Sequence, residues 1–232
     1  EHTSRGLGDV YKRQVRRPVA VACLTMILSL SGKLMIKDNL VREGRWNERT
    51  NHMGVGLINK TLGIVGFGGI GREFVKISKG LFKNIICYDP FVGKEEMKNQ
   101  QVYKVDFHEI ANSSDFLVIL CDLNEKTRGM IDSTFLNKMK SSSYLINLSR
   151  GPVVNEKHLI ASLKQNKISG AGLDVMTNEP IEENNELLNL KNTILTPHSL
   201  CWTDECFDSI ATEAITSILS YFNNKKIVNR VV

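Results

Sequence analysis

From Thr61 onward, short apolar runs alternate with longer stretches in which apolar residues recur every three or four positions. Such alternation is typical of a parallel sheet whose crossover helices cover both faces. The sequence therefore predicts an α/β fold with a doubly wound parallel sheet. The expected strands are TLGIVGF, NIICYD, DFLVILC, SYLINLS, GAGLDV and NTILTP, and the expected helices include 70–81, 133–139 and 156–165.

Helical patterns also flank this region. Apolar residues recur at helical spacing over 18–41, and Pro18 suits the first turn of a helix. We expect one long amphipathic helix there, followed by a polar, glycine-containing connection. A last helix is expected over 203–223, with Asp204 and Glu205 in its first turn, where the helix dipole favours acidic side chains. Its apolar face consists of Phe207, Ile210, Ala214, Ile215, Ile218 and Phe222.

The beginning of the chain has a different character. The segment 4–14, SRGLGDVYKRQ, resembles a translated sequencing adaptor. We therefore interpret 1–14 as a disordered artefact, which implies that the reading frame enters the gene in its interior; a genuine basic tail is the alternative. Residues 12–31 also imitate a secretory signal. That run is too short to span a bilayer and its apolar pattern continues beyond it, so we expect neither a signal nor a membrane partner.

Composition adds few constraints. The 232 residues suit one good core, and the formal net charge of +5 is spread along the chain. Because the basic residues do not cluster, we expect no nucleic-acid partner. The cysteines form no C-x-x-C pair, which predicts reduced, mostly buried thiols in a cytoplasmic protein without a metal site. They are Cys23, Cys87, Cys121, Cys201 and Cys206.

A glycine motif lies between the first strand and its helix. Gly66, Gly68 and Gly71 have the G-x-G-x-x-G spacing, in the strand-to-helix context that allows a tight turn and a close approach of pyrophosphate. Asp89 ends the next strand, where a carboxylate accepts hydrogen bonds from ribose hydroxyls and repels a 2′-phosphate. The sequence predicts a Rossmann-type site for NAD rather than NADP. A glycine-rich turn beside an ordinary aspartate is the alternative.

Polar residues also follow three later strands, at the edge where open α/β sheets bind ligands. Arg150, Asp174, Glu179 and His198 each have an ordinary surface or turn interpretation when taken singly. Together with GIVGFGGIG and KTRGMI, the stretches LINLSRGPVVNE, GAGLDVMTNEP and LTPH resemble the D-isomer-specific 2-hydroxyacid dehydrogenases, a family that includes phosphoglycerate dehydrogenase and glyoxylate/hydroxypyruvate reductase. The resemblance covers 15–232.

The resemblance implies a role for each of these residues. Arg150 binds the carboxylate and carbonyl oxygen of a small 2-hydroxy or 2-oxo acid. His198 exchanges a proton with that oxygen, and Glu179 orients the imidazole. Asp174 binds the nicotinamide carboxamide. The other implied cofactor contacts are Gly69 and Ile70 with the pyrophosphate, Asp89 with the ribose, and Cys121 and Ser149 with the nicotinamide half through their backbone.

The resemblance also implies a division of the chain. Residues 15–58 are a linking helix and connection, 59–197 the NAD-binding domain, and 198–232 a terminal helix that returns to a substrate domain. In the family that domain has roughly one hundred residues and begins the chain. We expect it to be truncated here, leaving both flanking helices without cover and the fragment able to bind NAD but poorly active or inactive. The full-length protein is expected to be a homodimer.

Several positions depart from the family pattern. Leu120 and Asp122 stand where the family often has His and Pro, Val21 replaces a common Glu, and Trp202 adds bulk after the final histidine. These departures leave the identity of the substrate open. An NAD(H)-sensing binding protein and an inactive NAD-binding fragment remain alternatives to the enzyme.

Overall fold

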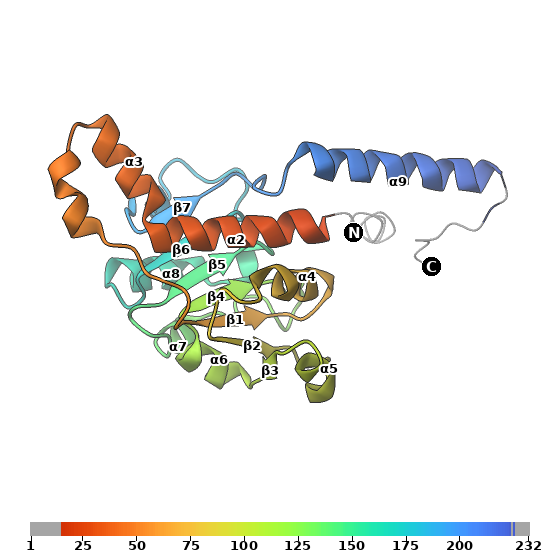
Figure 1. The fold of residues 1–232 in the computed structure, drawn as a ribbon, viewed down its shortest axis with the longest axis horizontal. Helices are drawn as coiled ribbons and strands as arrows, with labels where there is room; N and C mark the ends of the chain where they lie inside the picture. The colour runs from red at the N-terminus through yellow and green to blue at the C-terminus, as the bar shows by residue number, and fades with distance from the viewer. Residues whose placement is uncertain (1–14, 224, 226–232) are drawn as a thin grey trace.

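A computed structural model describes residues 15–223 and residue 225, so the adaptor prediction for 1–14 lies outside the described residues. Parallel strands form one sheet in the order β3-β2-β1-β4-β5-β6-β7, which confirms the predicted doubly wound fold (Figure 1). The strand order reverses between β1 and β4, which is where open α/β sheets bind ligands. The strands are β1 Thr61–Val65, β2 Asn84–Tyr88, β3 Tyr103–Lys104, β4 Phe116–Ile119, β5 Tyr144–Asn147, β6 Gly170–Leu173 and β7 Thr193–Leu195.

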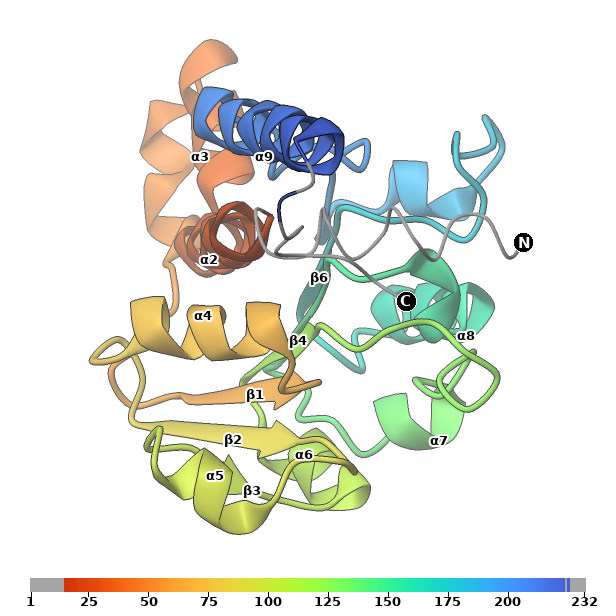
Figure 2. The same ribbon diagram turned by 90° about the vertical axis from the view of Figure 1, so that its right-hand side faces the viewer.

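Helices cover both faces of this sheet (Figure 2). Helices α2 and α4 pack on one face, and α6, α7 and α8 pack on the other. The helices are α2 Arg16–Gly32, α3 Leu34–Arg42, α4 Gly69–Ser78, α5 Lys94–Lys98, α6 Phe107–Ser113, α7 Ser133–Leu136, α8 Glu156–Lys164 and α9 Asp204–Phe222, with short 3-10 helices η1 Trp46–His52, η2 Gly151–Val153 and η3 Glu186–Asn189.

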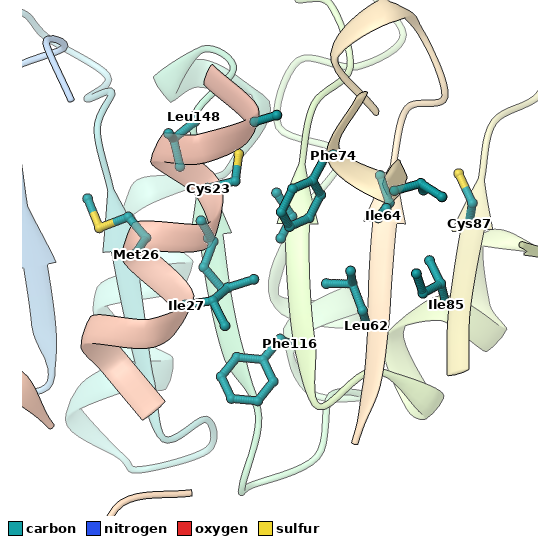
Figure 3. Close-up of a cluster of buried hydrophobic side chains, with 14 of the residues drawn as sticks. Cys23, Met26, Ile27, Leu62, Ile64, Phe74, Ile85, Cys87, Phe116 and Leu148 are labelled. Atoms are coloured by element: carbon teal, nitrogen blue, oxygen red, sulfur yellow. The ribbon is translucent and has the colours of Figure 1, made fainter. Parts of the chain in front are cut away.

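Helix α2 packs into the core on one face of the sheet. Cys23 and Ile27 of α2 and Phe74 of α4 share one buried cluster with Leu62 and Ile64 of β1 (Figure 3). The expectation that the helix over 18–41 lacks cover is therefore wrong for α2, because the sheet and α4 bury most of its apolar residues. It holds for α3, where Leu34, Met35 and Val41 each expose more than half of their surface. The apolar face of α9 is exposed as expected: Phe207, Ile215, Ile218 and Phe222 each expose more than half of their surface.

The expectation of one continuous helix over 18–41 is also wrong. Helices α2 and α3 are bent by 58° relative to each other at Lys33, whose φ of 54° is left-handed. The backbone N–H of Val55 donates to the carbonyl of Ser31 at 2.8 Å. This bond gives the end of α2 a partner from the returning chain, and the helical hydrogen-bond ladder stops there.

The same two helices bear on the question of membrane insertion. Within the described residues, no single helix is both long and apolar enough to cross a bilayer. Among the described helices, only α2 and α3 taken together, as a bent pair, have the length and apolar composition of a membrane span. The predicted domain boundaries at 58/59 and 197/198 stay predictions.

Candidate functional site

A cavity of about 570 Å³ opens at the carboxyl ends of β1, β2 and β4. This is the point where the strand order reverses, and the structure brings most of the predicted cofactor residues together there. Gly71 is buried in the first turn of α4 and does not line the cavity. The predicted residues that line the cavity are Gly66, Gly68, Gly69, Ile70, Asp89 and Cys121.

The three motif glycines meet different demands. Gly66 has a φ of 104°, and a Cβ at this position would lie 2.7 Å from the backbone nitrogen of Cys121. A Cβ on Gly71 would overlap the carbonyl oxygen of Gly66. A Cβ on Gly68 would meet no heavy atom of the described chain within 4 Å. Gly66 and Gly71 are thus required by the packing of the chain itself, while Gly68 leaves open space where a pyrophosphate fits.

Donors and acceptors around this space also suit a dinucleotide. Within the described residues, the N–H groups of Gly69 and Ile70 at the start of α4 have no acceptor. Oδ2 of Asp89 accepts the Phe67 N–H and Oδ1 accepts the Phe91 N–H, both at 2.8 Å. These bonds hold the carboxylate at the glycine loop and leave each oxygen a lone pair for a ribose hydroxyl.

Cys121 contributes little chemistry of its own. Its side chain lies at the end of β4 and is partly buried. Burial raises the pKa of the Cys121 thiol to about 12, so the group is neutral near pH 7. Any contact that it makes with a ligand is therefore through its backbone or its neutral sulfur.

A second group of predicted residues meets at the ends of β6 and β7. Nδ1 of His198 lies 2.7 Å from Oε2 of Glu179, whose Oε1 accepts the Met176 N–H at 2.9 Å. Partial burial acts to raise the pKa of the Glu179 carboxyl. Hydrogen bonds from His198 and Met176, helped by the nearby charge of Arg150, outweigh burial, and the pKa of this carboxyl lies below its ordinary value. Glu179 is thus a charged partner for the imidazole.

Asp174 holds the histidine segment from both sides. Its Oδ1 accepts the Thr196 hydroxyl at 2.5 Å and the N–H groups of Ser199 and Leu200 at 3.1 Å. Between these anchors His198 has a φ of 53°, a conformation that non-glycine residues rarely adopt. The three bonds to Asp174 oppose the relaxation of this backbone. Asp174, Glu179 and His198 together line a second cavity of about 420 Å³.

The hydrogen bonds that tether the His198 segment to Asp174 are expected to contribute to the free energy of unfolding, which substitutions of Asp174 test. Asp174→Ala removes three hydrogen bonds from a 3 % exposed carboxyl group and is expected to cost about 2 kcal/mol or more. Asp174→Asn keeps an oxygen acceptor and is expected to retain most of the stability. Urea unfolding followed by circular dichroism measures both. Equal unfolding midpoints for the two variants would contradict the tether.

Arg150 and Ser149 line neither cavity. Nη1 of Arg150 donates to the Ser149 carbonyl at 2.7 Å, and the Arg150 carbonyl accepts from Nδ2 of Asn147 at 3.1 Å. Oδ1 of Asn147 accepts both the N–H and the hydroxyl of Ser149. The sequence analysis missed Asn147, although a polar residue inside the apolar run YLINLS was a signal for it. This buried amide positions the segment that carries Arg150.

The fold and the site together are typical of a dinucleotide-binding α/β protein. The parallel sheet has a glycine loop where its strand order reverses and an aspartate at the end of β2. A histidine–carboxylate pair lies at the carboxyl ends of β6 and β7. A sequence model of the D-isomer specific 2-hydroxyacid dehydrogenase, NAD binding domain, matches residues 24–199. The chain belongs to this family, which confirms both the family resemblance and the prediction of NAD.

The curated relatives are longer than the part that this chain matches. It is 37% identical over 182 residues to the D-3-phosphoglycerate dehydrogenase of Archaeoglobus fulgidus, covering 78% of this chain and 34% of the relative. It is 36% identical over 202 residues to the glyoxylate reductase of Thermococcus litoralis, covering 84% and 61%. The chain thus spans between about a third and three fifths of these relatives' lengths. The crystal structure of a glyoxylate reductase from Paecilomyes thermophila superposes with a TM-score of 0.85 at 29% identity, covering 94% of this chain and 66% of that one.

Proposed function

We propose that the whole protein is an NAD-dependent oxidoreductase that interconverts a small 2-hydroxy acid and its 2-oxo acid. The observation that carries this proposal is the Glu179–His198 pair, with 2.7 Å between Oε2 and Nδ1, at the carboxyl edge of an NAD-binding sheet. The names of the relatives, a phosphoglycerate dehydrogenase and a glyoxylate reductase, support this substrate class.

Each side chain of the pair has a part in proton transfer. NADH, when bound, supplies the hydride that reduces the carbonyl carbon. His198 gives a proton from Nε2 to the carbonyl oxygen and takes it back in the reverse direction. Glu179 holds the ring through Nδ1, which leaves Nε2 for the substrate. Arg150 binds the substrate carboxylate through its planar fork and polarises the carbonyl with its charge.

The proposed cofactor contacts begin in the first cavity, which Gly69, Ile70, Asp89 and Cys121 line, and extend to Asp174 in the second cavity and to Ser149, which lines neither. The N–H groups of Gly69 and Ile70, which have no acceptor among the described residues, bind the pyrophosphate at the start of α4. Asp89 accepts the ribose hydroxyls. Cys121 and Ser149 contact the nicotinamide half through their backbone, and Asp174 binds the carboxamide with its remaining oxygen.

The proposal is tested by NADH oxidation with glyoxylate, hydroxypyruvate, pyruvate and 3-phosphohydroxypyruvate. The assay compares this chain with a version extended by any coding sequence found upstream of the Val15 codon. We expect the extended protein to reduce at least one of the acids, and this chain to bind NADH with little or no turnover. Full turnover by this chain would contradict the second expectation. NADH binding without turnover in both forms would favour an NAD(H)-sensing protein.

We further propose that the whole protein is a cytoplasmic homodimer. The exposed apolar residues of α3 and α9 support burial against another surface, and the free cysteines support a reducing compartment. Light scattering of the extended protein tests its assembly.

A further inference from the structure

Arg16 reaches the glycine loop from a distant part of the chain. It is the first residue of α2, and its half-buried side chain lines the 570 Å³ cavity together with Gly68 and Asp89. A Cβ placed on Gly69 would overlap the guanidinium group, with Cζ 2.6 Å away. The guanidinium therefore lies directly against the first residue of α4.

The backbone of Arg16 is held in place by its neighbours. The Val19 N–H donates to the Val15 carbonyl at 2.9 Å, which closes the first turn of α2 around Arg16. Nη1 of Arg17 forms an ion pair with Oε1 of Glu73 on α4 at 3.0 Å. The two arginines thus have separate environments: Arg17 joins α2 to α4, while Arg16 points into the cofactor cavity.

The charge of Arg16 is the unusual feature. Within the part of the chain that the structure describes, Arg16 has no ion pair or hydrogen bond. It lies beside the N-terminus of α4, where the N–H groups of Gly69 and Ile70 carry partial positive charge. A cation beside this helix end is unfavourable unless an anion binds to both. The guanidinium and the helix N-terminus therefore converge on a place for an anion.

We propose that Arg16 is a pyrophosphate-binding residue of the cofactor site, supplied by the linking helix rather than by the glycine motif. The family match begins at residue 24, so Arg16 lies outside it. The guanidinium binds the pyrophosphate from the α2 side of the cavity, and the N–H groups at the start of α4 bind it from the other side. The inference rests on NAD binding by the Gly66–Gly71 loop. It makes α2 a part of the cofactor site as well as of the core.

Isothermal titration of the whole chain with NADH and with ADP-ribose tests this role. Arg16→Gln is expected to weaken both ligands by about tenfold or more, because a charge-assisted hydrogen bond to phosphate is lost. Arg16→Lys keeps the charge without the fork and is expected to lose less. Arg17→Gln is the matched control, since its side chain is 61% exposed and pairs with Glu73; its affinity for both ligands is expected to match the wild type.

Adenosine, which lacks the pyrophosphate, separates this role from a structural one. Saturation-transfer NMR is expected to give the same adenosine signal for the wild type and Arg16→Gln. Unchanged or tighter NADH binding by Arg16→Gln would overturn the inference, as would a parallel loss of adenosine binding. Failure of the wild type to bind NADH would overturn the cofactor site itself. If instead the wild type and Arg16→Gln bind NADH equally well, the cofactor site stands and only the role of Arg16 is refuted.

Discussion

Replacing His198 by asparagine is expected to lower turnover of the extended protein by a factor of about 100 to 10,000, the usual contribution of a general acid–base group. Asparagine can still accept or donate a hydrogen bond near Glu179, but it cannot carry the proton that the carbonyl oxygen needs. NADH affinity is expected to stay unchanged, because His198 lines the second cavity and not the one that contains the glycine loop.

Two measurements separate chemistry from binding in this variant. Steady-state NADH oxidation gives kcat, and NADH fluorescence titration gives the dissociation constant. His108→Asn is the matched control, since His108 is exposed on α6 and contacts Lys138. Wild-type turnover in His198→Asn would refute the acid–base role. An equal loss of turnover in both histidine variants would show that the effect is not specific to the site.

Replacing Gly66 by alanine is expected to lower the free energy of unfolding by about 2 kcal/mol or more. The residue has a φ of 104°, and the new Cβ would lie 2.7 Å from the Cys121 nitrogen and 2.8 Å from the Leu120 carbonyl carbon. Neither backbone atom can move without disturbing β4. Urea unfolding measures this loss of stability, and the cofactor affinity of the variant is expected to fall with it.

Gly68→Ala is the matched variant in the same loop. Its φ of −74° is ordinary for alanine, and no heavy atom of the described chain lies within 4 Å of the new Cβ. Stability is expected to match the wild type, while NADH affinity falls about tenfold because the methyl group occupies the space left for the pyrophosphate. Undiminished NADH binding by Gly68→Ala would mean that the phosphates do not approach the loop there.

Much of the fold could be predicted because its signals are local. Apolar runs bounded by turn residues indicated β1, β2 and β4 to β7 within a few residues. The two-residue strand β3 was missed, since Tyr103–Lys104 is too short to show a pattern and forms only by pairing with β2. The helix break at Lys33 was missed for a similar reason. The break coincides with a hydrogen bond from Val55, far along the chain, to the Ser31 carbonyl at the end of α2.

The features of the candidate site also fall into those that the sequence shows and those that depend on tertiary contacts. By itself the sequence determined the sheet class, the glycine loop, the strand-end aspartate and the family resemblance, because residue type and spacing are sufficient for these. Only the tertiary structure decided how these parts meet. It showed that Asp174 holds both sides of His198, that Asn147 positions the segment of Arg150, and that Arg16 of α2 lies against Gly69. These contacts join residues from separate elements, and hydrogen bonds and packing between such elements exist only once the chain has folded.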